Sequence, residues 1–136
     1  MNLYISIPIS GHNKTEQRKL AQSTKESILV LYPDWVVVTP FEIADILDLE
    51  GKSTDGQYLG IDITHIIDTS DAVFFCKGWD DNSKGCAIEH AVAQVYGKIT
   101  FFEEHIKQHP VAPYHGKTLQ DMLNRRYAYL TRTTLK

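Results

Sequence analysis

Short apolar runs alternate with amphipathic segments along most of the chain. The apolar runs are rich in β-branched and aromatic residues and end at polar or breaker residues, as buried strands do. Predicted strands cover residues 3–9, 35–40, 71–76 and 98–102. Apolar residues recur at helical spacing in the segments between and after them. Predicted helices cover residues 14–32, 41–49, 58–70 and 118–130, with a further helix after Ser83. Residues 50–57 are predicted as a loop.

This alternation of strands and helices predicts right-handed βαβ units and an open, mostly parallel sheet with helices on both faces. With four to five strands, the expected structure is a small doubly wound α/β fold, Rossmann-like or flavodoxin-like. A length of 136 residues suits one domain, predicted here as residues 1–136. Sheets of this kind bind ligands at the carboxyl ends of their strands, where the strand order reverses. The loops at residues 8–12 and 77–85 are therefore the expected binding loops.

The helix that follows Ser83 carries one carboxylate in an otherwise apolar stretch. Ser83 is predicted to be its N-cap, because a serine hydroxyl can accept from a free backbone N–H group. Glu89 follows Gly85 by four residues, so the two share a face, and the Glu89 side chain leans toward the helix N-terminus. The positive end of the helix favours anions there. The buried stripe of this helix is predicted to consist of Ile88, Ala91, Val92 and Val95.

Glu89 is open to two interpretations, a solvated surface charge or a group presented to a ligand. Two further residues are equally ambiguous when taken alone. Asp62 lies in the predicted helix at residues 58–70, expected on a different face from Ile66, and it fits a surface charge. Tyr4 lies in the first strand and fits a core tyrosine whose hydroxyl is bonded locally.

Composition and charge exclude several classes of protein. Hydrophobic residues make up 43% and charged residues 23%, which indicates neither disorder nor a fibrous repeat. The net charge of −3 argues against a nucleic-acid polymer as partner. The N-terminal sequence lacks the pattern of a signal peptide and no stretch suits a membrane span, so a cytoplasmic protein without a membrane partner is expected. Cys76 and Cys86 are predicted to be reduced.

Neither a metal nor a cofactor is predicted. His105 and His109 have the spacing of a helical metal pair, but Pro110 follows them and no third ligand stands at a suitable spacing. A solvated loop or helix end is the favoured interpretation of this pair. The sequence has no P-loop and no dinucleotide fingerprint, which argues against an NAD-dependent oxidoreductase.

Three segments together resemble a known family. They are "YISIPISG" at residues 4–11, "GIDITHIIDTSDAVFF" at residues 60–75 and "GWDDNSKGCAIEHAVAQVYGK" at residues 78–98. They are similar to the nucleoside 2-deoxyribosyltransferase-like superfamily, above all to its small branch with a "YIS.PI.G" start and a "GW..S.G...EH..A" centre. The resemblance implies a Rossmann-like sheet and an enzyme that breaks N-glycosidic bonds of nucleosides or nucleotides.

The resemblance also implies catalytic roles by position. Glu89 matches the glutamate that attacks the anomeric carbon of the sugar. Asp62 matches the aspartate that donates a proton to the leaving base, and Tyr4 matches the tyrosine that positions the nucleophile. A carboxylate nucleophile and a protonated carboxyl group are a coherent pair for such a reaction, which passes through a covalent glycosyl ester.

Residues for substrate binding follow from the same resemblance. Members that hydrolyse nucleoside 5′-monophosphates have a serine six residues before the nucleophile, where members acting on free nucleosides tend to have an aspartate. Here it is Ser83, and a neutral donor at a helix N-terminus tolerates a phosphate. Trp79 is expected to form an aromatic wall, and Gly85 to leave room for the ligand. The predicted anion site is completed by Ser10, Gly11 and Lys84.

The resemblance leaves alternatives open. Ile7 stands where many members have a glycine, which favours a module that binds a nucleotide or sugar phosphate without cleaving it. An NAD glycohydrolase is a third reading, because a helical glutamate can also attack the nicotinamide ribose. Residues of a neighbouring subunit complete the site in the superfamily, so a homodimer or higher homo-oligomer is expected, with the tail from Glu103 onward as its surface and Phe102 as a contributor. Base, sugar and acceptor stay open.

Overall fold

The computed structural model describes residues 1–47, 52–81, 83–103 and 127–129. Within these ranges, five parallel strands form one open sheet in the order β2-β1-β3-β4-β5. The sheet confirms the predicted α/β class, and each predicted strand overlaps an observed one. The strands are β1 (Asn2–Ser6), β2 (Val36–Val38), β3 (Ala72–Phe75), β4 (Ile99–Phe102) and β5 (Tyr127–Tyr129).

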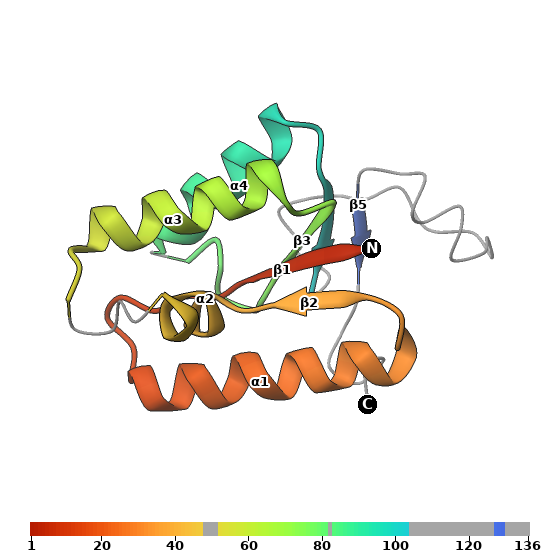
Figure 1. Cartoon of the computed structure of the whole chain (residues 1–136), viewed down its shortest axis with the longest axis horizontal. Coiled ribbons are helices and arrows are strands. Elements are labelled where there is room, and N and C mark those ends of the chain that lie inside the picture. The colour runs from red at the N-terminus through yellow and green to blue at the C-terminus, as the bar shows by residue number, and fades with distance from the viewer. Residues whose placement is uncertain (48–51, 82, 104–126, 130–136) are drawn as a thin grey trace.

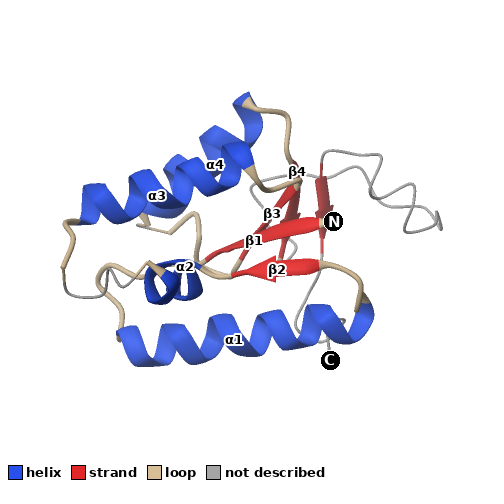
Figure 2. Cartoon of the chain, in the orientation of Figure 1, coloured by secondary structure: helices blue, strands red, loops and turns tan. Residues whose placement is uncertain are grey.

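Helices cover both faces of this sheet. In Figures 1 and 2, α1 lies along one face while α3 and α4 lie together on the other. The short helix α2 follows β2 and contacts both β1 and α3. Among the described residues, no helix is long and apolar enough to cross a membrane. The helices are α1 (Lys14–Leu31), α2 (Pro40–Ile46), α3 (Asp55–Asp68) and α4 (Lys84–Val95).

Strand β1 is buried on both faces and divides the core in two. Leu3, Ile5 and Ile7 pack in a cluster with residues of α1. Tyr4 packs in a second cluster with residues of α3 and α4. Ser6 faces the same side as Tyr4, because successive side chains of a strand point to opposite faces. Strand β1 therefore presents a polar pair to the side of the sheet that α3 and α4 cover.

The predicted buried stripe of α4 is wrong at Ile88, Ala91 and Val95, which are exposed, while Val92 is partly buried. The residues that α4 buries are Cys86, Glu89 and Ala93. Both faces of this helix carry apolar residues, so hydrophobicity alone does not decide which one packs on the sheet. Cys86 and Ala93 are small, and small residues allow a helix to approach the sheet closely. Glu89 consequently points inward.

Helix α3 begins earlier than predicted, within the expected loop at residues 50–57. Thr54 and Gln57 form a capping box, a signature that is visible in the sequence and that starts the helix at Asp55. The prediction that Asp62 and Ile66 occupy different faces is also wrong. Residues four apart on a helix are neighbours, and both side chains face the interior between α3 and the sheet.

The predicted helix at residues 118–130 is wrong at its one described part. Tyr127–Tyr129 is strand β5, paired in parallel with β4. Aromatic residues such as Tyr127 and Tyr129 are common in strands. Pairing with β4 satisfies the backbone hydrogen bonds of this segment, and the helical spacing of its apolar residues gave no sign of that neighbour. The rest of that helix, and most of the tail predicted as a dimer surface, lie outside the described residues.

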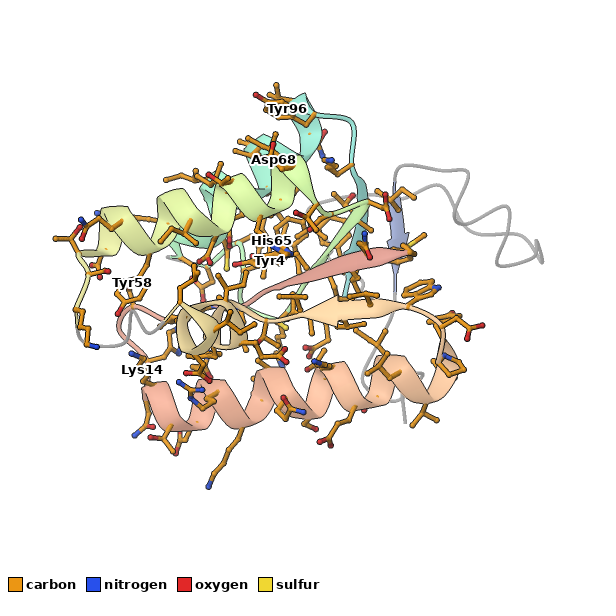
Figure 3. All side chains as sticks on the ribbon, viewed as in Figure 1. Tyr4, Lys14, Tyr58, His65, Asp68 and Tyr96 are labelled. Carbon is orange, nitrogen blue, oxygen red and sulfur yellow. The ribbon has the colours of Figure 1, made fainter. Side chains whose placement is uncertain are left out.

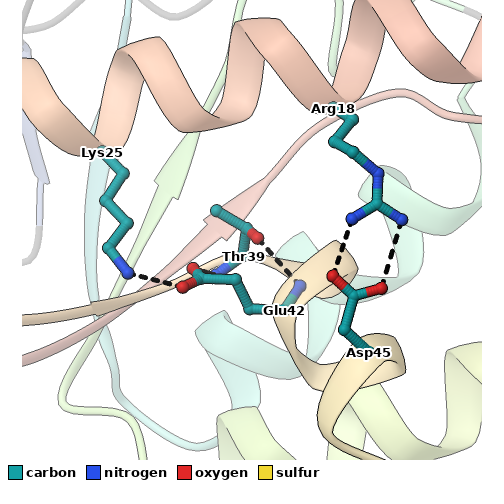
Figure 4. Close-up of polar contacts among 5 residues, drawn as sticks. All are labelled: Arg18, Lys25, Thr39, Glu42 and Asp45. Carbon is teal, nitrogen blue, oxygen red and sulfur yellow. Dashed lines mark hydrogen bonds and ion pairs between the residues drawn. The ribbon is translucent and has the colours of Figure 1, made fainter. Parts of the chain in front are cut away.

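Helix α2 is held at its N-terminus by a cap and along its length by two ion pairs (Figure 4). Thr39 and Glu42 form a capping box before Pro40. Glu42 Oε2 also lies 2.6 Å from Lys25 Nζ of α1. Asp45 receives two hydrogen bonds from Arg18, with distances of 2.7 and 3.3 Å. These contacts fasten α2 to α1.

Thr39→Ala is expected to lower the free energy of unfolding by about 1 kcal/mol, because the first turn of α2 loses the acceptor of its cap. Urea denaturation followed by circular dichroism measures this. Thr15→Ala, at an exposed position in the first turn of α1, is the control and should leave stability unchanged or slightly raised. Equal stability of the two variants would show that the cap contributes nothing.

Candidate functional site

The site lies where the strand order reverses, between β1 and β3. The chain leaves β1 for one side of the sheet through β2, and β3 pairs on the other side of β1. The two loops that follow β1 and β3 touch, since a Cβ built on Gly78 would lie 3.8 Å from Pro8 Cγ. These are the loops predicted to bind a ligand, and their position is the one that doubly wound sheets use for that purpose.

Glu89 of α4 is the most unusual residue at this place. It is only 4% exposed although it is a carboxylate. The Ser6 hydroxyl of β1 donates a hydrogen bond of 2.9 Å to Glu89 Oε1. The second oxygen, Oε2, is buried, and no donor among the described residues hydrogen-bonds it. Burial raises the pKa of Glu89 to about 7, while the hydroxyls of Tyr4 and Ser6 act in the opposite direction.

Asp62 faces Glu89 from α3. Burial, and then the negative charge of Glu89, raise its pKa to about 8, although the Tyr4 hydroxyl acts against them. Burial, and then the negative charges of Glu89 and Asp62, hold the pKa of the Tyr4 phenol well above its ordinary value. Tyr4 is therefore protonated near neutral pH. The structure thus brings together the three residues that the sequence marked as catalytic.

Two carboxyl groups with different pKa values can divide acid and base roles between them. Burial and mutual repulsion keep about one proton on the pair of Asp62 and Glu89 near neutral pH, and when that proton is on Asp62 the Glu89 carboxylate is ionised. Glu89 is then available as an ionised nucleophile or base. Asp62 is available as a proton donor.

Cys86 lies one helical turn before Glu89 on the same buried face of α4. Burial raises the pKa of its thiol to about 11, with the Ser6 and Ser83 hydroxyls acting against that rise. The thiol therefore stays protonated. The Cys86 N–H group donates to Ser83 Oγ at 3.3 Å, which confirms Ser83 as the N-cap of α4.

Gly85 leaves space beside the N-terminus of α4, because a Cβ built there would meet no heavy atom within 4 Å. Lys84 is exposed in the first turn of the same helix. Ser10 and Gly11 are exposed in the turn after β1, where Gly11 has a φ of +80°. The role of these residues in an anion site stays a prediction.

Trp79 lies in the loop after β3 but is buried within an aromatic cluster. Its ring centroid lies 5.1 Å from that of Phe75, 4.5 Å from that of His90 and 5.4 Å from that of Phe102. The cluster holds the loop against the sheet. Its predicted part as a wall for the ligand stays a prediction.

Two residues of this site were not predicted. Ser6 could have been found from the sequence, because a strand that directs Tyr4 toward the site directs the residue two positions later to the same side. His65 follows Asp62 by three residues on α3, and its ring centroid lies 6.1 Å from that of Tyr4 (Figure 3). Burial lowers the pKa of His65. Ile7 packs on the opposite side of the sheet, with α1, so it does not occupy the space beside Glu89.

The donor set offers no metal centre in the part of the chain that the structure describes, where no group of three or more His, Cys, Asp or Glu side chains could hold an ion. His105 and His109 lie outside the described residues.

Comparison with protein families places the chain in one of them. A family model described as "Domain of unknown function (DUF4406)" matches residues 1–102. No curated protein matches the chain, and no solved structure does. The matched range contains all the residues of the site described above.

The two raised carboxyl pKa values predict that stability falls as the pH rises. The folded state binds more protons than the unfolded chain from about pH 4 up to about pH 8, so the unfolded state is favoured progressively across this range. The double variant Glu89→Gln/Asp62→Asn should weaken this fall. Thermal unfolding from pH 5 to pH 9 measures it, and a shift of several degrees is expected.

The matched control replaces two exposed carboxylates in the same way, Glu26→Gln/Asp34→Asn. It should keep the wild-type dependence on pH. A double variant of Glu89 and Asp62 with the wild-type dependence would contradict the assigned protonation states.

Proposed function

The chain belongs to the family described as a domain of unknown function (DUF4406), and we propose that it cleaves or transfers the N-glycosidic bond of a nucleoside or nucleoside 5′-monophosphate. The observation that carries the proposal is the buried carboxylate of Glu89, which lies near Asp62, a carboxyl group with a raised pKa. Ser6 holds one oxygen of Glu89, and the other receives no hydrogen bond from the described residues. The resemblance of the sequence to the deoxyribosyltransferase-like superfamily supports the same reaction.

In the first step, a lone pair of the Glu89 carboxylate forms a bond to the anomeric carbon of the sugar. The bond between that carbon and the base nitrogen breaks, and its electron pair stays on the base. Asp62 donates its proton to the departing base and becomes a carboxylate. The products are the free base and a glycosyl ester of Glu89.

In the second step, water or the nitrogen of a second base attacks the anomeric carbon, and the ester bond to Glu89 breaks. The Asp62 carboxylate takes the proton that the acceptor loses. Both carboxyl groups then return to their starting states. Hydrolysis and transfer differ only in the acceptor.

The pKa values suit this sequence of steps. A nucleophile with an ordinary carboxylate pKa would be ionised at neutral pH, but so would an ordinary aspartate, and no proton would be available for the base. The pKa of about 8 at Asp62 keeps that proton in place, while Glu89, at about 7, is largely ionised at slightly alkaline pH. The buried phenol of Tyr4 can donate to either carboxylate without losing its own proton.

A 5′-monophosphate is the favoured substrate class. Ser83 caps α4, so its hydroxyl lies at the positive end of that helix, where a phosphate is stabilised and an aspartate would repel it. Lys84 supplies a positive charge in the same turn. Gly85, in the same turn, leaves open space where a side chain would otherwise stand.

The test is base release by chromatography, from a panel of ribonucleosides, deoxyribonucleosides, their 5′-monophosphates and NAD. The wild type should release base from at least one of them. Glu89→Gln should lower that rate by roughly 10³-fold or more, because the amide is a poor nucleophile, and Asp62→Asn by roughly 10² to 10⁴-fold, because it removes the proton donor.

Controls separate chemistry from folding. Glu26→Gln, at an exposed position, should keep wild-type rates, and circular dichroism should show that the site variants are folded. Thermal stabilisation by a nucleotide without any base release would favour the binding module over the enzyme. Release of nicotinamide alone would favour the NAD glycohydrolase.

The variant Gly85→Ala tests whether Gly85 is needed to make room for substrate, because it should affect activity and helix stability in opposite directions. The added methyl group meets no protein atom, and alanine is the better helix former, so stability should be unchanged or rise by up to about 1 kcal/mol. The value of kcat/KM should nevertheless fall about tenfold, because the methyl group occupies space reserved for substrate. Gly56→Ala, at the second residue of α3, is the matched control and should leave kcat/KM unchanged. Equal activity of both variants would remove Gly85 from the site.

A further inference from the structure

We propose that Ser6 is a positioning residue that fixes the Glu89 carboxylate, so that Oε2 is the oxygen that bonds to the anomeric carbon. This inference rests on the proposed function and assigns the reacting atom within it. Neither the family description nor the resemblance of the sequence gives Ser6 a role.

The first support is the unequal treatment of the two carboxylate oxygens. Oε1 accepts the Ser6 hydroxyl at 2.9 Å in a buried hydrogen bond, whereas Oε2 is buried without a hydrogen bond from the described residues. A hydrogen bond draws electron density from the oxygen that accepts it, and it must be broken or stretched if that oxygen attacks. An oxygen without such a bond keeps its lone pairs free. A buried acceptor without a donor also lowers the stability of the protein, and such groups persist mainly where they serve a bound ligand.

The second support is the rigidity of Ser6. Its side chain is fully buried, and its backbone is paired with Phe75 in the register of β1 and β3. The Cys76 N–H group donates to the Ser6 carbonyl at 2.9 Å, which extends this pairing at the carboxyl end of the strand. A sheet residue at the point where strand order reverses is a firm reference for a side chain on α4.

The third support is the orientation of the Ser6 hydroxyl itself. Its proton is used toward Glu89, so its oxygen can only accept from other groups. The Cys86 thiol lies near both the Ser6 and the Ser83 hydroxyls, and because it stays protonated it is a much weaker acceptor than a carboxylate. The Ser6 proton is therefore directed at Glu89, as the 2.9 Å hydrogen bond to Oε1 shows. Ser6 thereby restrains Oε1, while the Tyr4 hydroxyl also favours the ionised form of the same carboxylate.

Ser6→Ala is the test of this role. It should lower kcat about 10 to 100-fold with little change in KM, because substrate contacts remain while the nucleophile loses its orientation. The acid limb of the pH profile should move to higher pH, because the lost hydrogen bond favoured the ionised form of Glu89. Ser6→Thr keeps the hydroxyl and should restore the wild-type limb.

Ser70→Ala is the matched control. Ser70 is also buried, but its hydroxyl bonds to a backbone carbonyl, that of His65, rather than to a carboxylate. This variant should leave the acid limb of the kcat pH profile at its wild-type position, even if it changes the stability of the fold. A purely structural role for Ser6 predicts equal effects of the two variants, with no movement of the acid limb, and would overturn the proposal.

The reacting atom can be observed directly. A 2-deoxy-2-fluoro nucleoside slows breakdown of the glycosyl ester, so a crystal soaked with it should show the sugar bonded to Oε2 and the Ser6 hydroxyl still donating to Oε1. An ester at Oε1 would overturn the assignment. Normal rates and an unshifted pH profile of Ser6→Ala would overturn it while the glycosidase stands. A wild type that releases no base would overturn the proposed function, and the assignment with it.

Discussion

The burial of one carboxylate against the first strand is the constraint on which the site depends. Glu89 gives up its hydration when α4 packs on the sheet, and the Ser6 hydroxyl replaces only part of it. A buried carboxylate without full compensation keeps its proton to a higher pH than it would in water. Its negative charge, when ionised, in turn raises the pKa of Asp62 across the interface of α3 and α4. The electrostatics of the site therefore follow from how one helix lies on one strand.

The strand that receives this carboxylate serves two purposes. Leu3 and Ile5, together with Ile7 just beyond the end of the strand, anchor α1 and complete the larger part of the core. Tyr4 and Ser6, on the other side, supply hydroxyl groups to the site. A strand paired on both edges and covered on both faces moves little, so the groups that it carries are held in place by the core itself.

Much of the architecture could be predicted from the sequence. The strands 3–9, 35–40, 71–76 and 98–102 were recognisable as apolar runs, and parallel pairing followed from their alternation with helices. Tyr4, Asp62 and Glu89 were also singled out, through motifs that resemble those of a known superfamily, and the structure places the three residues close together. The orientation of α4 was not predictable in this way, because Ile88 and Val95 form as good an apolar stripe as the residues that the helix buries. Strand β5 was missed because three residues beside β4 gain their structure from that neighbour.

The sequence by itself therefore determined the class of fold, the loops at the reversal of strand order and the identity of the carboxylates, since these depend on local pattern and on residue type. Only the tertiary structure decided which face of α4 is buried. That choice brings Glu89 into a hydrogen bond with Ser6 and places its charge close enough to raise the pKa of Asp62. The physical reason is that hydrogen bonding and desolvation depend on distances between segments far apart in the chain. Ser6 and Glu89 are separated by 83 positions, and nothing in the sequence near either residue records their contact.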